Sequence, residues 1–317
     1  MIKVENISKS FASVKAVDNV SFTVEKGENF ILLGTSGCGK TTTLKMLNHL
    51  IKPDGGRILI EEEDISAKNP EELRRGIGYV LQGNGLFPHY TVAENIAIVP
   101  NLLGWEANKT AQRTRDLLEK LHLDIKYLKV YPDELSGGQQ QRVGLARALA
   151  VDPPILLMDE PFGALDTVTR SKIRAEFSDL EELKRKTIVM VTHDVQEAFE
   201  LGDRICLMDG GKIVQQGSPA DLLFNPANSF VSDFLKEQRL QLKFKAIKLE
   251  QVVPLSAEGD TYVLNNKRVD SNTDLWRILE EMSFGDAGDL VIKDRQQNTL
   301  RSTSFNELME IFHNYKN

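Results

Sequence analysis

The chain has 317 residues, of which 41% are apolar, and a formal net charge of −7. This length allows one large domain and a small one, and the acidic balance argues against a generally basic surface, so we expect no nucleic-acid partner. Its two cysteines form no disulfide framework, and no run approaches the roughly 18 apolar residues of a membrane span, so we expect any membrane role to depend on a partner.

Strand-like and helix-like segments alternate along much of the chain. Short apolar runs cover residues 29–33 and 155–158, and a β-branched run covers 187–192 after a charged helical stretch at 173–186. Apolar runs of this length, separated by helices, are typical of a parallel sheet covered by helices. The pattern predicts an α/β domain.

Residues 34–41 read Gly-Thr-Ser-Gly-Cys-Gly-Lys-Thr and fit the phosphate-binding pattern G-x-x-x-x-G-K-[ST]. Glycines let backbone N–H groups converge on phosphate oxygens, and the following helix, whose apolar residues recur through Ile51, adds its dipole. We expect Lys40 to reach the β- and γ-phosphates of ATP and the Thr41 hydroxyl to bind Mg²⁺. The candidate nucleotide-binding residues of this segment are Gly34, Thr35, Ser36, Gly37, Cys38, Gly39, Lys40, Thr41 and Thr42.

Residues 88–152 have a different pattern. Three helical stretches, at 91–98, 109–121 and 139–150, have no convincing strand between them, which predicts a helical subdomain inserted into the sheet domain. The segment Ser136–Gln139 precedes the last stretch. A serine hydroxyl and glycine N–H groups at a helix start favour an anion.

Polar candidates follow three of the strand-like runs. Asp159 and Glu160 come at the end of the 155–158 run, Gln82 follows 79–81, and His193 follows 187–192. In open α/β sheets, ligands bind at the carboxyl ends of the strands, so we expect Asp159, Glu160, His193 and the glycine loop to meet at one edge. A carboxylate at such a position suits Mg²⁺.

Beyond a charged segment at 236–250, the sequence predicts a small α+β domain over 239–317. The expected elements are a strand at 262–264, a helix with Leu275, Ile278, Leu279 and Met282 on one side, a strand at 290–292, a turn at 294–298 and a helix over 308–312, preceded by a capping box of Ser304 and Glu307.

Taken in chain order, these motifs resemble those of the ATP-binding subunits of ABC transporters. The segments that carry the resemblance are Gly34–Thr41, Leu135–Gln139, Ile155–Glu160 and Thr192–Asp194. The resemblance covers roughly residues 1–235. It implies a P-loop ABC ATPase domain over 1–238, with a RecA-like sheet core and the helical subdomain at about 88–152.

The resemblance also implies a role for each residue at the expected sheet edge. In the family, the counterpart of Glu160 polarises the attacking water as general base, and the counterpart of His193 contacts the γ-phosphate. The counterpart of Gln82 touches Mg²⁺ or that water and connects the nucleotide to the membrane partner. Thr41, Gln82 and Asp159 are the expected Mg²⁺ ligands.

Further residues match the family pattern. Phe11 corresponds to the aromatic residue that stacks on adenine, with a core phenylalanine as the alternative, and Asp166 belongs to the loop that joins two active sites. The helix-start segment would hold the γ-phosphate of ATP bound on a second copy of the chain, which implies a head-to-tail dimer. Its candidate residues are Ser136, Gly137, Gly138 and Gln139.

The stretches 85–92, 94–100 and 102–105 resemble the ATPases of osmoprotectant importers, which take up glycine betaine, carnitine or choline. This implies integral membrane permease subunits as partners, an indirect link to a solute-binding protein, and a peripheral place at the cytoplasmic face of the membrane. The alternatives are an importer ATPase for another small solute, such as an amino acid, and a soluble ABC ATPase outside transport. The tail resembles a single CBS-type module with a regulatory or dimerising role.

Overall fold

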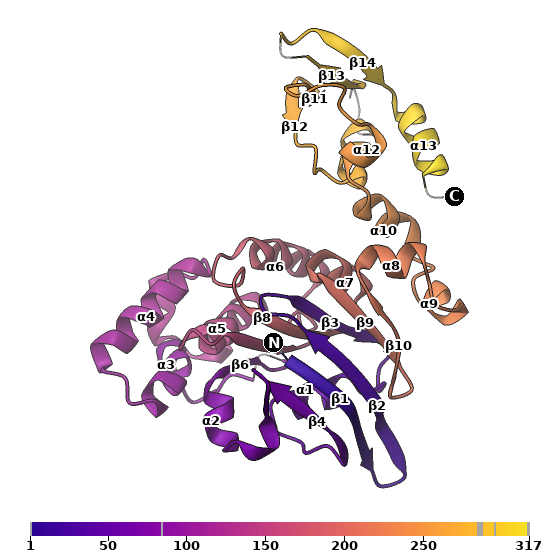
Figure 1. The fold of residues 1–317 in the computed structure, drawn as a ribbon. Helices are drawn as coiled ribbons and strands as arrows, with labels where there is room; N and C mark the ends of the chain where they lie inside the picture. Colours follow the sequence, from indigo (N-terminus) through magenta and orange to yellow (C-terminus); the bar gives the residue numbers. More distant parts are fainter. Residues whose placement is uncertain (1, 84, 284–287, 295, 316–317) are drawn as a thin grey trace. The chain divides into compact units, whose positions relative to one another are not determined.

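The computed structural model describes residues 2–83, 85–283, 288–294 and 296–315, in two compact units of residues 1–218 and 219–317 (Figure 1). Among these residues, no helix has both the length and the apolarity to cross a membrane.

A six-stranded sheet forms the centre of the first unit. Its strands lie in the order β10 (Lys212–Gly217), β9 (Arg204–Asp209), β3 (Asn29–Gly34), β8 (Thr187–Thr192), β7 (Ile155–Asp159) and β6 (Ile77–Val80). β9, β3, β8, β7 and β6 are parallel, and β10 pairs antiparallel with β9. Every residue of β7 and β8 is buried, as expected for strands covered on both faces. The predicted parallel core is confirmed.

A second, four-stranded antiparallel sheet is absent from the sequence-based prediction. Its order is β2 (Val14–Val24), β1 (Ile2–Phe11), β4 (Gly55–Ile60) and β5 (Glu63–Asp64). Ile2 and Phe22 from this sheet share one apolar core with Phe30 and Val191 of the parallel sheet. Phe22 and Phe30 stack with ring centroids 4.9 Å apart.

Two helices of the first unit end earlier than predicted. α1 (Lys40–Leu47) ends before Leu50, because His49 has a left-handed backbone (φ 50°), and Leu50 is 50% exposed. α6 (Thr167–Asp179) begins before the expected stretch at 173–186 and is followed by turns with bonds between residues three apart, such as Leu183 N to Leu180 O. Outside the helical insertion, the first unit also contains α2 (Pro70–Arg75), α7 (Val195–Leu201) and a 3-10 turn at Ile65–Ala67.

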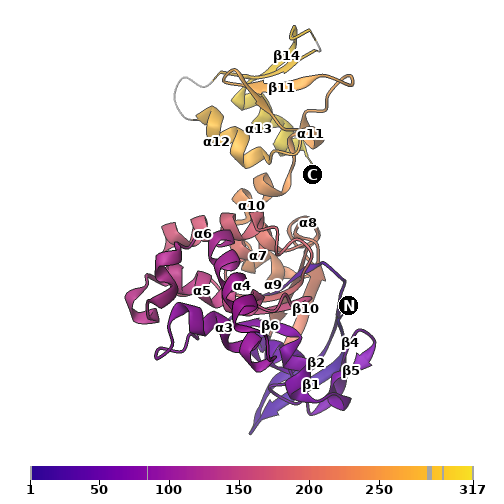
Figure 2. The ribbon, with the colours of Figure 1, turned by 90° about the vertical axis from the view of Figure 1, so that its left-hand side faces the viewer.

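The insertion between β6 and β7 is helical, as predicted. It contains α3 (Val92–Leu102), α4 (Ala107–Lys120), α5 (Gly137–Leu149) and 3-10 turns at Ile125–Lys129 and Pro132–Glu134. The three helices contact one another and gather at one side of the first unit (Figures 1 and 2). Capping boxes at Thr91 and Ser136 fix the starts of α3 and α5.

The second unit places two helices on one face of an antiparallel sheet. The sheet has the order β12 (Lys267–Val269), β11 (Thr261–Leu264), β13 (Leu290–Lys293) and β14 (Thr299–Thr303), and the helices are α12 (Leu275–Ser283) and α13 (Phe305–Asn314). The apolar side predicted for α12 is buried, and the Ser304 capping box is present. The strand β12, which forms a hairpin with β11, is additional to the predicted order.

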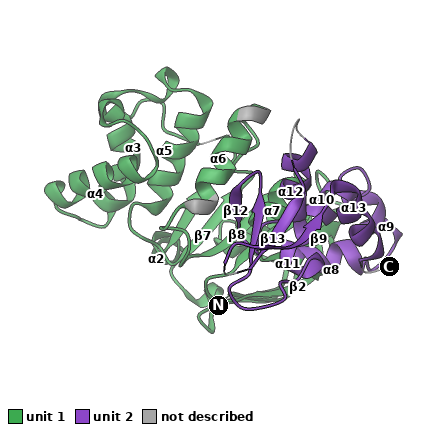
Figure 3. Ribbon diagram, turned by 90° about the horizontal axis from the view of Figure 1, so that it is seen from above, with its two compact units in different colours: residues 1–218 green, residues 219–317 purple. Residues whose placement is uncertain are grey.

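The division between the units differs from the predicted boundary at 238/239. α8 (Pro219–Phe224) and α10 (Arg239–Ala246) contact each other, and Phe224 packs against the apolar core of the second unit. α8, α9 (Ser229–Phe234), α10 and α11 (Leu249–Val252) therefore belong to residues 219–317, which are coloured separately in Figure 3.

Candidate functional site

Four neighbouring parallel strands bring the predicted polar residues together. In the order β6, β7, β8 and β3, these strands lead into Gln82, Glu160, His193 and the glycine loop at their carboxyl ends. The predicted meeting of Asp159, Glu160, His193 and the glycine loop at one edge of the sheet is thus confirmed, and Gln82 lies at the same edge. Residues far apart in the sequence meet here because parallel neighbours all end on the same side.

The glycine loop has the backbone conformation that its sequence predicts. Gly37 and Gly39 have φ angles of 77° and 100°, in the left-handed region that favours glycine. A Cβ on Gly39 would lie 2.2 Å from Ala16 O of β2, so no larger residue fits there. No side chain caps α1, which leaves its first N–H groups available to an anion.

Lys40 is buried and lies across the loop. Its Nζ donates to Gly34 O at 2.9 Å and to Thr35 O at 2.8 Å. The Thr35 hydroxyl in turn donates to Asp209 Oδ1 at 2.9 Å, which anchors the loop to the end of β9. Cys38 is buried with Sγ 3.8 Å from Lys40 Nζ, so only its backbone can line a phosphate site. The ammonium therefore lies where a phosphate cradled by the loop would need a cation.

Asp159 and Thr41 form the candidate metal position. Thr41 Oγ1 donates to Asp159 Oδ1 at 2.8 Å, and Asp159 is only 3% exposed. Burial raises the pKa of Asp159, and the hydrogen bond from Thr41 opposes that rise. A buried carboxylate beside a hydroxyl fits a hard cation such as Mg²⁺, which takes one or two protein ligands together with phosphates and water. Among the described residues, no group of three or more His, Cys, Asp or Glu could hold a metal alone.

Glu160 is held on both oxygens of its carboxylate. Gln82 Nε2 donates to Oε2 at 3.2 Å, and His193 Nδ1 lies 3.2 Å from Oε1. The Glu160 backbone is left-handed (φ 45°), and its N–H donates to Val191 O on β8 at 2.9 Å. A carboxylate fixed in this way can accept a proton from a water molecule at the sheet edge.

The start of α5 forms a second group of candidate residues. Gln139 N donates to Ser136 Oγ at 3.4 Å, and Ser136 N donates to Gln139 Oε1 at 2.8 Å. A Cβ on Gly137 would lie 3.6 Å from Leu165, and one on Gly138 would lie 2.9 Å from Ile173. This helix start therefore packs on α6 and on the loop before it.

Phe11 and Asp166, two further predicted residues, are exposed. Phe11, at the end of β1, is 47% exposed, which contradicts the alternative of a core phenylalanine, and Lys9 Nζ lies 5.8 Å from the centre of its ring. Asp166 accepts a hydrogen bond from Thr169 N at 3.0 Å and so caps the first turn of α6.

Asp194 and Asp209 also lie at this edge, although the sequence predicted no role for either. Asp194 directly follows His193, and its Oδ1 accepts from Gln196 N at 2.8 Å and from Glu197 N at 3.1 Å. Asp209 could have been found by the strand-end argument, because it closes the apolar run of β9 beside β3.

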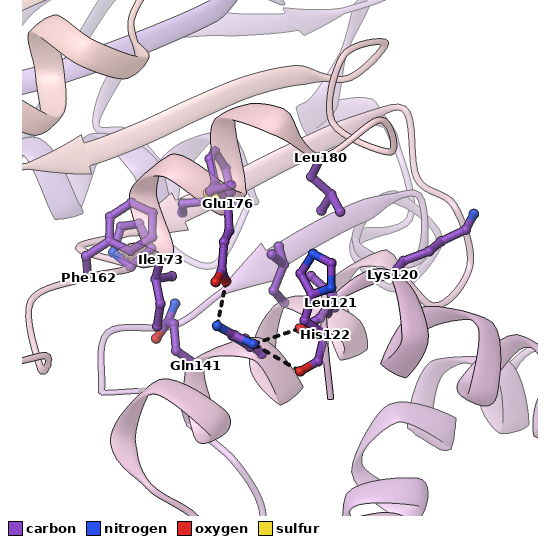
Figure 4. Close-up of a pocket in the computed structure, with 13 residues that line it drawn as sticks. Lys120, Leu121, His122, Gln141, Phe162, Ile173, Glu176 and Leu180 are labelled. Carbon is purple, nitrogen blue, oxygen red and sulfur yellow. Dashed lines mark hydrogen bonds and ion pairs between the residues drawn. The ribbon is translucent and has the colours of Figure 1, made fainter. Parts of the chain in front are cut away.

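An apolar pocket lies between α5 and α6 (Figure 4), and its lining includes Met158 and Pro161, the neighbours of Asp159 and Glu160 in the chain. Arg142 is one of its lining residues: Nη1 donates to Leu121 O at 3.2 Å and His122 O at 3.1 Å, and Nη2 pairs with Glu176. None of the predicted nucleotide-binding residues lines the pocket. Residues of both the helical insertion and the sheet domain line the pocket.

Known proteins resemble this chain closely. The ABC transporter family model matches residues 17–163. The glycine betaine/carnitine/choline transport ATP-binding protein of Bacillus subtilis is 48% identical over 282 residues, covering 86% of this chain and 74% of the relative. The osmoprotectant import ATP-binding protein of Salmonella typhimurium is 51% identical, covering 75% of this chain and 64% of the relative. The glycine betaine uptake system ATP-binding protein of Escherichia coli is 44% identical, covering 92% of this chain and 91% of the relative.

A solved structure also matches a large part of this chain. It is a dimeric ATP-binding cassette in a post-hydrolysis state, bound to ADP and Pi. The TM-score is 0.62 at 34% identity, and the match covers 69% of this chain and 98% of the other.

Removal of the Lys40 ammonium tests the phosphate site. We expect Lys40→Ala to weaken ATP binding at least about tenfold, because hydrogen bonds to charged groups contribute roughly 1.5–3 kcal/mol. Titration calorimetry of the full chain measures this, with Lys26→Ala, an exposed lysine in the turn after β2, as the matched control. An unchanged dissociation constant for Lys40→Ala would contradict the assignment.

Proposed function

Because the chain belongs to the ATP-hydrolysing subunits of ABC transporters, we propose that it powers the import of a quaternary-amine osmoprotectant through separate membrane permease subunits. Glycine betaine, carnitine and choline are the proposed solutes, since they occur in the names of relatives 44–48% identical to the chain. The observation that carries ATP hydrolysis is the placement of the Glu160 carboxylate between Gln82 and His193, beside the glycine loop.

The residues at this edge of the sheet have different roles in the proposed hydrolysis of ATP. The glycine loop, the first N–H groups of α1 and Lys40 bind the phosphates of ATP. Thr41, Asp159 and Gln82 would hold Mg²⁺, which when bound neutralises charge on the phosphates. Glu160 accepts the proton of the attacking water, and His193 orients Glu160 and contacts the γ-phosphate.

A second copy of the chain completes the proposed site. The match with a dimeric cassette supports a head-to-tail dimer, in which the α5 start of one copy faces the glycine loop of the other. Ser136 and the N–H groups of Gly137 and Gly138 would then hold the γ-phosphate from the opposite side. Asp166 would link the two sites, and Phe11 would stack on adenine.

The membrane partners are inferred from the relatives and from the surface. Transport, import and uptake occur in the relatives' names, which supports permease subunits, an indirect link to a solute-binding protein, and a peripheral place at the cytoplasmic face of the membrane. Leu81, just before Gln82, and Phe87 and Tyr90, after it, are exposed and offer apolar area to a permease helix.

For the tail, we propose a single CBS-type module over 239–317 with a regulatory or dimerising role. The order β11, α12, β13, β14 and α13, with the additional strand β12 after β11, supports this, since β11, α12, β13 and α13 lie where the sequence predicts a strand, a helix, a strand and a helix.

Replacing Glu160 by a neutral residue tests whether ATP hydrolysis is lost while ATP binding remains. We expect Glu160→Gln to keep ATP affinity but to lower hydrolysis by about 10²–10⁴-fold, because general base catalysis contributes that much. Phosphate-release assays on the full chain measure the rate, with Glu181→Gln, an exposed glutamate, as control. Wild-type turnover in Glu160→Gln would exclude it as the base.

Mixing two inactive variants tests the dimer. Lys40→Ala should disable the glycine-loop half of a site, and Gly137→Asp should disable the helix-start half by placing a negative charge near phosphate. Each variant alone should be inactive, whereas the mixture should regain ATPase activity, since a mixed pair contains one site with both halves intact. Absence of recovery, although cross-linking detects mixed pairs, would contradict the head-to-tail arrangement.

Reconstitution in liposomes with the permease and the solute-binding protein tests the solute. We expect glycine betaine, carnitine or choline to stimulate ATP hydrolysis, while an amino acid such as histidine does not. Stimulation by the amino acid alone would contradict the osmoprotectant assignment and leave the ATPase assignment intact.

A further inference from the structure

Two segments of the chain meet at Glu160, and contacts between them form a closed ring. On one side, His193 Nδ1 lies 3.2 Å from Glu160 Oε1, and Asp194 is the next residue. On the other side, the chain after Glu160 turns sharply, with Gly163 N donating to Glu160 O at 3.1 Å, and continues to Leu165. Each side alone could shift relative to the other.

Arg170, on α6, joins the two sides. Its Nη2 donates to Leu165 O at 3.0 Å, and its Nη1 lies 3.4 Å from Asp194 Oδ2. Its backbone N–H donates to Asp166 O at 2.9 Å, so the loop at 161–166 is held by both the main chain and the guanidinium of one residue. The Arg170 side chain is only 23% exposed, which limits solvent screening of its charge.

The Asp194 carboxylate, which faces Arg170, is itself held in place by hydrogen bonds. Its Oδ1 accepts the two N–H groups at the start of α7, from Gln196 and Glu197, and its own N–H donates to Thr192 Oγ1 at 3.0 Å. The carboxylate thus cannot turn without disturbing the helix start, and Oδ2 faces Arg170. Because Asp194 is bonded to His193, the imidazole position depends on the same anchor.

We propose that Arg170 is a positioning residue for ATP hydrolysis. It ties the loop at 161–166 to Asp194, and so fixes His193 and Glu160 relative to each other. This inference rests on the proposed ATPase function. Leu165 also lies next to Gly137 at the start of α5. Because Arg170 binds the Leu165 carbonyl, a displacement of the loop would be transmitted to His193 through Arg170.

Arg174 provides a matched control on the same helix. It lies one turn further along α6, its Nη2 pairs with Glu200 Oε2 at 3.2 Å, and its Nη1 lies 4.0 Å from Asp194 Oδ1. The Arg174 side chain is 7% exposed, against 23% for Arg170, so Arg174→Ala removes a guanidinium that is at least as buried. Among the described residues, its ion pairs are with acids and it holds no carbonyl of the loop.

The test compares Arg170→Ala, Arg174→Ala and Asp194→Asn in the full chain, with and without His193→Ala. Steady-state ATPase rates, ATP dissociation constants and thermal unfolding midpoints are measured for each. We expect Arg170→Ala to lower kcat by about 10–100-fold, the effect of a misplacement on the order of 1 Å, with ATP affinity within about twofold of wild type. Arg174→Ala should lower kcat much less.

Two further results separate positioning from a general loss of structure. Asp194→Asn keeps a side chain that caps α7 but removes the charge facing Arg170, so it should lower kcat as Arg170→Ala does. In the His193→Ala background, Arg170→Ala should have little additional effect, because residues that act as one unit are not additive.

Three outcomes would overturn the inference. The first is a wild-type kcat in Arg170→Ala, and the second is an equal loss of kcat in Arg170→Ala and Arg174→Ala. The third is a loss of kcat in the double variant with His193→Ala that equals the product of the two single losses. If the midpoint shows that Arg170→Ala does not fold, Asp194→Asn decides by the same criteria. Absence of ATP turnover in the wild-type chain would instead overturn the proposed function, which distinguishes the two failures.

Discussion

The order of four parallel strands determines what this protein can do. Because β6, β7, β8 and β3 are neighbours, their carboxyl ends bring Gln82, Glu160, His193 and the glycine loop to one edge. The contacts there keep Glu160 in a left-handed backbone conformation, which costs on the order of 1–3 kcal/mol and persists only where the surroundings impose it. The bond from Glu160 N to Val191 O provides that constraint, so the strand pairing also sets the direction of the carboxylate.

The predictable part of the site follows from local sequence. An apolar run that ends in a polar residue predicts a strand end, and the rule for parallel sheets then places Asp159 and His193 at the same edge. The antiparallel sheet was not predictable in this way, since β1 pairs with β2 and β4 through registers that shift at several points. The end of α1 shows a related limit: apolar spacing continues to Leu50, but the left-handed backbone at His49 ends the helix first.

Contacts that depend on tertiary distance could not be read from the sequence. Arg170 and Arg174 stand in a charged stretch that resembles a solvated helix face, and only the fold shows both guanidinium groups directed at acids near His193. Asp209 anchors Thr35 across neighbouring strands for the same reason. The unit boundary differs from the predicted one because α8, although it follows β10 closely, contacts α10 and supplies Phe224 to the second core.

The central claim is that ATP is hydrolysed at this strand edge, with the α5 start of a second copy completing the site. A structure of Glu160→Gln with ATP and Mg²⁺ tests it most directly. The account predicts a closed dimer in which each γ-phosphate lies between Lys40 of one copy and Ser136 of the other. ATP bound away from the glycine loop, or a γ-phosphate contacted by both residues of a single copy, would contradict it.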